Sequence, residues 1–365
     1  MIILAIVFLL VLFVLLFMSQ SKFGKKPAGA TLNRMKLSNN FGKGMFQNKN
    51  FTPQLTDGAT YYSVMKKFFF QRSKRLKPKG LIPSHRTDLY AIPIDKNVLV
   101  WFGHSYYFIQ ASGKRILVDP VFSGAASPIK STAKSFPGSD VYSTEDFPQI
   151  DYLFLSHDHW DHLDYESVKA LIPKVGKVIC GLGVGEHLKH WGYNPDVIFE
   201  NDWDQHIVLD KGFEVNTVAS RHFSGRGFKR NQSLWLSFAF TTPAFKIFIG
   251  GDSGYDTHFA KAGKDFGPFD LVILECGQYD KSWKHIHMLP NEILQAAKDL
   301  GAQRVLPVHW GKFALANHDW DTPIIELTKL NAMDQIPLLT PKIGEVIILD
   351  DSEQVFSKWW EEVEK

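Results

Sequence analysis

Apolar residues form short runs along most of the chain, and glycine, proline or polar residues separate these runs. From residue 97 onward the runs have the length and the β-branched and aromatic content that are typical of strands. The predicted strands cover residues 98–102, 106–110, 115–118, 152–155, 177–180, 213–219, 234–240, 245–249, 271–275, 304–308 and 346–349. Ala111-Ser112-Gly113 is predicted to be the turn of a hairpin.

Helical patterns lie between several of the later strands. The clearest covers 290–300, with Pro290 at its start and Gly301 directly after it, where these residues are common at helix ends. Residues 61–71 and 163–171 are also predicted to be helical, and 351–365 to form a C-terminal surface helix. Because hairpins come first and helices alternate with strands later, we expect an α/β (α+β) domain over 97–350, a sandwich of two sheets with helices outside.

Residues 1–18 form an unbroken apolar run. As a helix the run would extend roughly 27 Å, close to the hydrocarbon thickness of a bilayer. A cleaved signal peptide is the competing interpretation, but the run has neither a basic start nor a small-residue end. We therefore predict a single-pass membrane anchor over 1–20, and the lysines that follow it, Lys22, Lys25 and Lys26, favour a cytoplasmic body.

Charge is distributed unevenly along the chain, whose net charge is +3. Residues 21–80 contain 14 Lys or Arg and one acidic residue, Asp57, so the remainder has 27 basic and 37 acidic residues. This predicts a basic neck over 21–96 that wraps an acidic body. A basic segment can contact nucleic acid or an anionic membrane surface. Its position after an anchor favours the membrane, and nucleic acid is not expected as a partner.

Composition narrows the class of protein further. A hydrophobic content of 45% and a charged content of 22% are typical of a globular protein with a core. The two cysteines, Cys180 and Cys276, lie in apolar strand-like contexts, so we predict buried free thiols and no disulfide. The sequence does not fix the oligomeric state, and a homodimer is one of the assemblies it allows.

One stretch carries most of the chemistry, Ser156-His157-Asp158-His159-Trp160-Asp161-His162. It follows an apolar strand, so a single turn presents three imidazoles and a carboxylate. These are ligands that Zn²⁺ prefers. His157 and His159 can face one ion, and Asp161 and His162 can reach a second. The alternative interpretation is a solvated loop at a helix start, in which an aspartate caps the helix.

Four more polar residues follow apolar strands or precede a helix: His222, Asp252, His287 and His309. Each by itself is more often a turn, a cap or a hydrogen-bonded surface residue. Together they provide the ligands that the first motif lacks, and Gly250-Gly251 before Asp252 would allow close approach of the backbone.

The order of these motifs resembles the metallo-β-lactamase superfamily of binuclear metal hydrolases, over roughly 97–350. The resemblance rests on HDHWDH, SRH, GGDSGY and PVHWG in sequence. It is closest to the branch of N-acyl-phosphatidylethanolamine-hydrolysing phospholipases D, on which the runs at 101–105 and 119–122, Ala126-Ser127-Pro128 and the His-Met-x-Pro run at 287–290 also match. Related sugar-lactone hydrolases share several of these stretches. The resemblance implies an αββα sandwich.

The resemblance also implies a set of site residues. His157, His159 and His222 would bind a first Zn²⁺, Asp161, His162 and His309 a second, and Asp252 would bridge the two, with other divalent metals as alternatives. His287 matches a position near the substrate phosphate. The predicted catalytic residues are Asp161 and His287. The family usually has a Trp-Cys pair after the third histidine, where this chain has Phe223-Ser224.

We therefore expect a phospholipase D-type phosphodiesterase that uses a metal-bridged hydroxide. Its substrate would be a membrane glycerophospholipid, such as N-acyl-phosphatidylethanolamine, cleaved to N-acylethanolamine and phosphatidic acid. The alternative is a metal-dependent hydrolase of a small lactone or phosphoester on the same fold. A membrane-tethered binding protein with a degenerate site is disfavoured by the complete ligand set. A nuclease is disfavoured by the acidic body.

Overall fold

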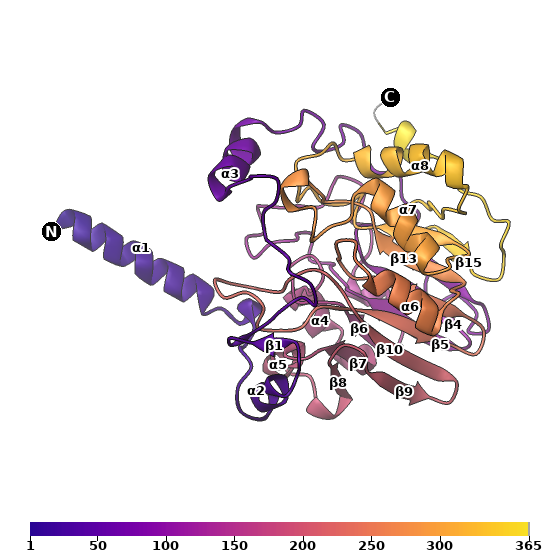
Figure 1. Ribbon diagram of the computed structural model, residues 1–365, viewed down its shortest axis with the longest axis horizontal. Helices are drawn as coiled ribbons and strands as arrows, with labels where there is room; N and C mark the ends of the chain where they lie inside the picture. Colours follow the sequence, from indigo (N-terminus) through magenta and orange to yellow (C-terminus); the bar gives the residue numbers. More distant parts are fainter. Residues whose placement is uncertain (364–365) are drawn as a thin grey trace.

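Alternation of side chains along the central strands builds a sandwich of two sheets. In β6 (Ile150–Leu155), Tyr152 and Phe154 belong to the core between the sheets. Leu153 and Leu155 belong to a second core under the outer helices. All four are buried, since successive residues of a strand point to opposite faces and both faces are covered. The computed structural model describes residues 1–363 (Figure 1).

The first sheet has seven strands in the order β15-β3-β4-β5-β6-β7-β8. Its other members are β3 (Val98–Trp101), β4 (Tyr107–Ala111), β5 (Lys114–Val118), β7 (Val175–Gly181), β8 (Ile198–Asn201) and β15 (Val346–Ile348). The pairs from β15 to β5 are antiparallel, and those from β5 to β8 are parallel.

The second sheet has six strands in the order β14-β13-β12-β11-β10-β9. These are β9 (His206–Asp210), β10 (Phe213–Ala219), β11 (Leu236–Thr241), β12 (Lys246–Ile249), β13 (Leu271–Glu275) and β14 (Val305–Val308). The strands β12, β13 and β14 are parallel neighbours, so their carboxyl ends meet at one edge of the sheet.

Helices cover the outer faces of both sheets. The helices α4 (Tyr165–Ala170) and α5 (Val184–Trp191) share the core of the seven-stranded sheet. On the six-stranded sheet lie α6 (His258–Phe266), α7 (Pro290–Asp299) and α8 (Thr322–Asp334), which Figure 1 shows in orange and yellow. The predicted sandwich with outer helices is therefore confirmed.

The predicted strands agree with the structure to within about two residues at most ends, but two strands of the large sheets were missed, as was the short pair in residues 41–46. The two missed strands of the large sheets are β8 and β9, which lie at the edges of the two sheets. Their side chains are only partly covered, and Val208 in β9 is 62% exposed. Edge strands lack the continuous apolar run that marks the central ones. Cys180 and Cys276 are buried free thiols, as predicted.

The N-terminal apolar run forms α1 (Ile2–Met18), which projects from the body (Figure 1). Among the described residues, no helix combines the length and the apolar character needed to traverse a bilayer. The structure thus does not support the transmembrane anchor predicted over 1–20, nor the orientation derived from it. The helix has 17 residues and rises about 25 Å.

The segment after α1, predicted as a basic neck, contains α2 (Gly29–Lys36), the short pair β1 (Phe41–Gly42) and β2 (Met45–Phe46), and α3 (Tyr61–Phe70). Several of its basic side chains form ion pairs with acidic residues of the body. These pairs are Arg34–Glu200, Lys49–Asp204, Lys67–Asp280 and Arg75–Asp319, at 3.8, 2.5, 2.6 and 3.4 Å. Part of the positive charge of the neck therefore serves to attach it to the acidic body.

The C-terminal helix predicted over 351–365 is not present as such. Up to residue 363 this segment contains one 3₁₀ turn, Trp359–Glu361, and residues 364–365 lie outside the described part of the chain. Trp359 and Trp360 are both buried, and Trp359 stacks on Trp310 with the ring centroids 5.1 Å apart. Burial of both adjacent indoles on the core stabilises this conformation more than the backbone hydrogen bonds of a regular surface helix would.

Candidate metal centre

The candidate donors come from the carboxyl ends of strands in both sheets. His157 follows β6, His222 follows β10, Asp252 follows β12 and His309 follows β14. Because these ends meet along one rim of the sandwich, residues separated by half the chain become neighbours. The structure brings together all seven predicted donors, His157, His159, Asp161, His162, His222, Asp252 and His309. Their role as metal ligands remains a prediction.

One group of donors consists of His157, His159, His222 and Asp252, with one atom of each lying within 4.8 Å of the others. His159 Nδ1 lies 2.9 Å from His157 Nε2 and 3.2 Å from His222 Nε2. Asp252 Oδ2 is 3.8 Å from His157 Nε2 and 3.7 Å from His222 Nε2. Three imidazole nitrogens thus converge on one point with a carboxylate beside them.

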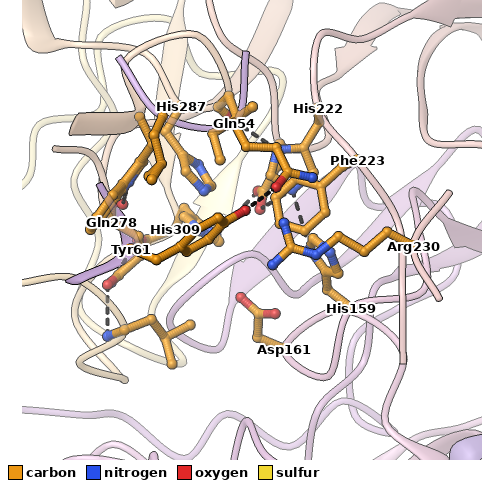
Figure 2. A pocket seen from close by; sticks show the side chains of 15 residues that line it. Gln54, Tyr61, His159, Asp161, His222, Phe223, Arg230, Gln278, His287 and His309 are labelled. Atoms are coloured by element: carbon orange, nitrogen blue, oxygen red, sulfur yellow. Dashed lines mark hydrogen bonds and ion pairs between the residues drawn. The ribbon is translucent and has the colours of Figure 1, made fainter. Parts of the chain in front are cut away.

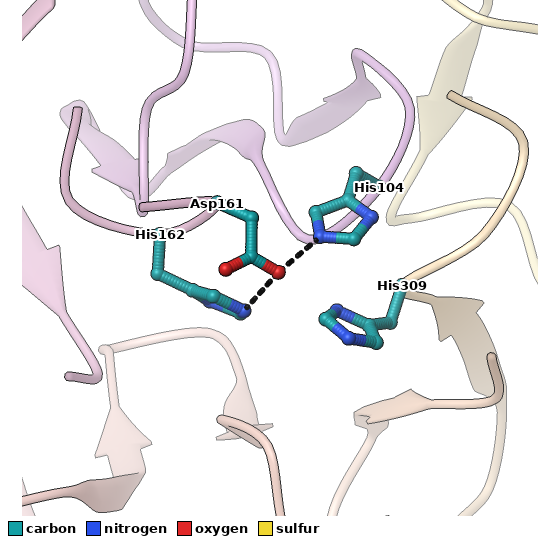
Figure 3. Close-up of side chains that lie close together, drawn as sticks. All are labelled: His104, Asp161, His162 and His309. Carbon is teal, nitrogen blue, oxygen red and sulfur yellow. Dashed lines mark hydrogen bonds and ion pairs between the residues drawn. The ribbon is translucent and has the colours of Figure 1, made fainter. Parts of the chain in front are cut away.

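The second group is His104, Asp161, His162 and His309 (Figure 3). Asp161 Oδ2 lies 2.9 Å from His104 Nε2 and 3.6 Å from His162 Nε2. Asp252 faces this group as well, with Oδ2 3.2 Å from His162 Nε2 and Oδ1 3.3 Å from His309 Nδ1. Asp252 therefore lies within 4 Å of histidines of both groups.

The atoms that face these centres fit divalent metal ions. His162 Nε2 and Asp252 Oδ1 are buried without a hydrogen-bond partner among the described residues. The opposite nitrogens are occupied: His222 Nδ1 lies 2.8 Å from Ile286 O, and His162 Nδ1 lies 2.8 Å from Asp119 Oδ2. An imidazole that donates through Nδ1 presents a lone pair at Nε2, which is the form that binds a metal.

Burial sets the protonation of the histidines. It lowers the pKa of His157, His222 and His309 well below the usual value, and neighbouring imidazoles lower it further. Burial also lowers the pKa of His159 to about 4. Neutral imidazoles at pH 7 are the form that metal binding requires.

His162 is the exception among the histidines. Burial opposes its charge, but the carboxylates of Asp252 and Asp161 and the contact with Asp119 outweigh burial and raise its pKa. In the unloaded site His162 would therefore balance this negative charge. A cation that binds there has to displace the proton, so metal binding is expected to release protons.

A cavity of about 280 Å³ opens in front of the donors (Figure 2). His159, Asp161, His222, Asp252 and His309 form its floor. Its walls carry polar, aromatic and apolar side chains from the body and the neck: Gln54, Leu55, Tyr61, Phe223, Arg230, Gln278, Trp283, Ile286, His287 and Leu315. This volume suits a small polar group such as a phosphodiester and is at the lower limit for ligand pockets.

His287 lines the cavity next to the donors, with its ring stacked on that of His309 at 5.3 Å. Its Nδ1 lies 2.5 Å from Glu275 Oε2. Glu275, at the end of β13, also accepts hydrogen bonds at Oε1 from the backbone N–H groups of Ser253 and Met288, both at 3.1 Å. This carboxyl group therefore fixes the ring of His287, with Nε2 as the nitrogen free to meet a ligand.

Phe223 stands where the family usually has tryptophan, and it contributes to the wall of the cavity. Its ring packs against those of His159 and His222 at 4.4 and 4.7 Å. The guanidinium of Arg230 lies over this ring, 4.8 Å from its centroid. Ser224 donates to Ser233 O at 2.6 Å and is buried, so it holds the loop and does not line the cavity.

Three residues near the centre were not predicted as site residues: His104, Asp119 and Glu275. His104 and Asp119 lie in stretches noted only for the family resemblance, and Glu275 is the last residue of a predicted strand. His104 and Asp119 share one signal in the sequence, which is their place just after a strand. Asp119 directly follows β5, and His104 follows β3 after Gly103. Both have positive φ, 50° and 42°, a conformation that concentrates at functional sites and cannot be read from sequence.

Known proteins are similar to this chain over the part that contains the donors. Residues 114–310 match the family model of the beta-lactamase superfamily domain. An uncharacterised protein of Mycobacterium tuberculosis is 37% identical over 278 residues, which are 75% of this chain and 74% of the relative. The N-acyl-phosphatidylethanolamine-hydrolyzing phospholipase D 1 of Caenorhabditis elegans is 29% identical over 238 residues, which are 60% of this chain and 65% of that protein.

A solved structure shows the same fold. Igni18, a metallo hydrolase from the archaeon Ignicoccus hospitalis, aligns with a TM-score of 0.55 and 17% identity over 69% of this chain and 98% of its own.

Proposed function

Since the chain belongs to the metallo-β-lactamase superfamily of metal-dependent hydrolases, close to its N-acyl-phosphatidylethanolamine phospholipase D branch, we propose that it is a zinc-dependent phosphodiesterase acting on a glycerophospholipid. The proposed reaction cleaves N-acyl-phosphatidylethanolamine to N-acylethanolamine and phosphatidic acid. The observation that carries the proposal is the cavity itself, because two groups of donors, His287 and Arg230 face one hollow of phosphodiester size.

We assign His157, His159 and His222 to one Zn²⁺ and Asp161, His162 and His309 to the other, with Asp252 shared. When bound, such ions supply an activated water and neutralise the charge of a phosphodiester. His104 is a further donor beside the second group, within hydrogen-bond distance of Asp161. It orients that carboxylate or joins the second set of ligands.

Two residues of the chain are proposed to act on the substrate. The imidazoles around Asp161 hold its pKa below the usual range despite burial, so it remains a carboxylate that can hold a water or accept its proton. His287 is held by Glu275, and its Nε2 can donate to a non-bridging phosphate oxygen. Burial raises the pKa of Glu275 and lowers that of His287, so the dyad shares one proton without separated charges.

We propose an anionic phospholipid surface as the partner. All residues of α1 are accessible and apolar, and exposed apolar area of this extent marks an interaction surface. Lys25 and Lys26 are exposed a few residues after α1. Their positive charges attract the anionic headgroups of such a surface.

The experiment is product analysis by mass spectrometry after incubation of the purified full-length protein with mixed micelles of N-acyl-phosphatidylethanolamine. The expected result is equimolar N-acylethanolamine and phosphatidic acid, lost with a chelator and with His159→Ala, and retained with His206→Ala. His206 is an exposed histidine on β9 that does not line the cavity, and it is the matched control. Activity that survives both the chelator and His159→Ala would contradict the proposal.

The second candidate is hydrolysis of a small lactone or phosphoester by the same residues. The modest volume of the cavity, about 280 Å³, favours it, because such a molecule would fit there whole. Sugar lactones and bis(p-nitrophenyl) phosphate, assayed beside the lipid, separate the two. Turnover of a lactone at a kcat/KM above that of the lipid would establish the alternative.

A further inference from the structure

A second hollow, of about 520 Å³, adjoins the cavity at the metal centre. The two share His159, Asp161, Phe223, Arg230 and Leu315. The second hollow extends from these residues to the end of α1, and we call it the α1 groove. The remainder of its lining is mostly apolar, with Phe17, Met18, Phe23, Ala126, Trp160 and Phe228 among its residues.

Aromatic rings form a continuous wall from α1 to the donors. Phe17 packs edge-on against Phe23 at 5.3 Å, and Phe23 packs in the same way against Trp160 at 5.1 Å. Trp160 stands between His159 and Asp161 in the chain. A hydrocarbon chain lying on this wall would therefore end beside the candidate metal ligands.

Hydrogen bonds from buried groups fix this wall. The guanidinium of Arg226 lies 3.9 Å from the centroid of Trp160. It donates to Lys22 O at 2.9 Å, which ties the segment after α1 to the motif loop, and to Asp158 O at 2.9 Å. Trp191 adds a hydrogen bond to Ser21 O at 2.7 Å. The α1 groove is therefore formed by the folded chain and does not need a ligand to assemble it.

The charges around the α1 groove complement a phospholipid. Phe228 is 84% exposed at its edge and is followed by the exposed Lys229 and Arg230. Arg230 lines both hollows, so a cation stands where an apolar channel meets the polar cavity. A ligand with an apolar chain and an anionic phosphate matches this order of surfaces.

We propose that the α1 groove binds an acyl chain of the glycerophospholipid substrate, with the phosphodiester in the cavity at the metal centre. The inference rests on the proposed function for its substrate, and it assigns a separate part of the molecule to the lipid tail. Substrate would then enter from the side of α1. A hydrocarbon chain in the groove gains free energy with each methylene removed from water, so long-chain substrates are preferred.

The test measures chain binding and catalysis separately. A fluorescent long-chain lysophospholipid, below its critical micelle concentration, is titrated into wild type, Phe23→Asp and Gly227→Trp. Phe23→Asp makes the wall polar, and Gly227→Trp places an indole in the groove. A Cβ at residue 227 would lie 2.9 Å from the flexible end of Met18, which can move aside for alanine. The controls are Val355→Asp, at a residue 91% exposed outside the groove, and Gly227→Ala.

Both groove variants are expected to raise the Kd of the probe at least about tenfold, and both controls to leave it unchanged within about twofold. Hydrolysis of bis(p-nitrophenyl) phosphate, which has no chain, should stay within about twofold of wild type in all four variants. An unchanged Kd in Phe23→Asp and Gly227→Trp, or no binding by wild type, would overturn the inference. Groove-dependent binding by a protein that cleaves no phosphodiester would instead overturn the proposed function and leave the chain site standing.

Discussion

Glu275 Oε2 lies 2.5 Å from His287 Nδ1, and both groups are buried, with His287 lining the cavity. The carboxyl group is itself held by two backbone N–H groups, so it has one orientation. His287 precedes α7 and Glu275 ends β13, so this contact joins two elements of the six-stranded side. It determines which nitrogen of His287 can face a substrate.

Replacement of Glu275 by leucine is therefore expected to lower kcat/KM by about ten- to a hundredfold, because the ring of His287 loses its orienting partner. Glu275→Gln keeps a hydrogen-bonding group at the same distance and should retain most of the activity. Steady-state kinetics over a range of pH would also show a displaced pH profile for Glu275→Leu. Glu326→Leu, at an exposed glutamate on α8, is the control, and an equal loss in that variant would contradict a specific role for Glu275.

Metal removal is expected to destabilise the protein. The chelated protein would retain the buried imidazoles and carboxylates of both groups without the charge that balances them. Loss of tightly bound ions should lower Tm by about 10 °C, given the linkage between binding and folding. Elemental analysis should find about two ions per chain in wild type and fewer in His157→Ala. A metal content in His157→Ala equal to that of His206→Ala would exclude His157 as a ligand.

Asp119→Asn should weaken metal binding without replacing a donor. Asp119 Oδ2 accepts from His162 Nδ1 at 2.8 Å and from Ser156 Oγ at 2.5 Å, and an amide nitrogen at that place could accept neither. The lone pair of His162 would then no longer be held toward the centre, and affinity should fall about ten- to a hundredfold. Asparagine also tolerates the positive φ at this position. Competition with a chelating dye measures the affinity, with Asp265→Asn on α6 as the control.

The stability of the protein should depend on His258 in mildly acidic solution. Burial lowers the pKa of His258 to about 4, from an ordinary value near 6.5. Above pH 6.5 this imidazole is neutral in both states. As the pH falls below 6.5, His258 becomes protonated in the unfolded chain, whereas in the folded protein it stays neutral until about pH 4. The free energy of unfolding therefore decreases.

Between pH 7.5 and pH 5.0 the contribution of His258 is a loss of about 2 kcal/mol. The free energy of unfolding, measured in urea at these two pH values, should decrease by about this much more in wild type than in His258→Gln. His258 Nε2 lies 3.0 Å from Ser253 Oγ, a contact that the glutamine amide can replace. Equal losses in the two proteins would show that His258 does not titrate in this way.

The sequence determined much of the fold because its core strands are continuous apolar runs. The predicted strands 213–219 and 271–275 coincide with β10 and β13. The pattern failed where burial is one-sided or partial, as at β9, and where an aromatic pair, Trp359 and Trp360, is buried by contacts from distant residues. The N-terminal apolar run, identified over residues 1–18, coincides with α1 to within one residue.

For the site, the sequence by itself determined the seven candidate donors, because imidazoles and carboxylates after apolar strands are a local pattern. The family resemblance implied a bridging Asp252, but only the tertiary structure showed the donors together at one rim and gave the distances from Asp252 to His162 and His222. It also added His104, Asp119 and Glu275, and joined the α1 groove to the cavity. The physical reason is that these relationships are distances between residues far apart in the chain, which sheet order and packing decide and local patterns do not encode.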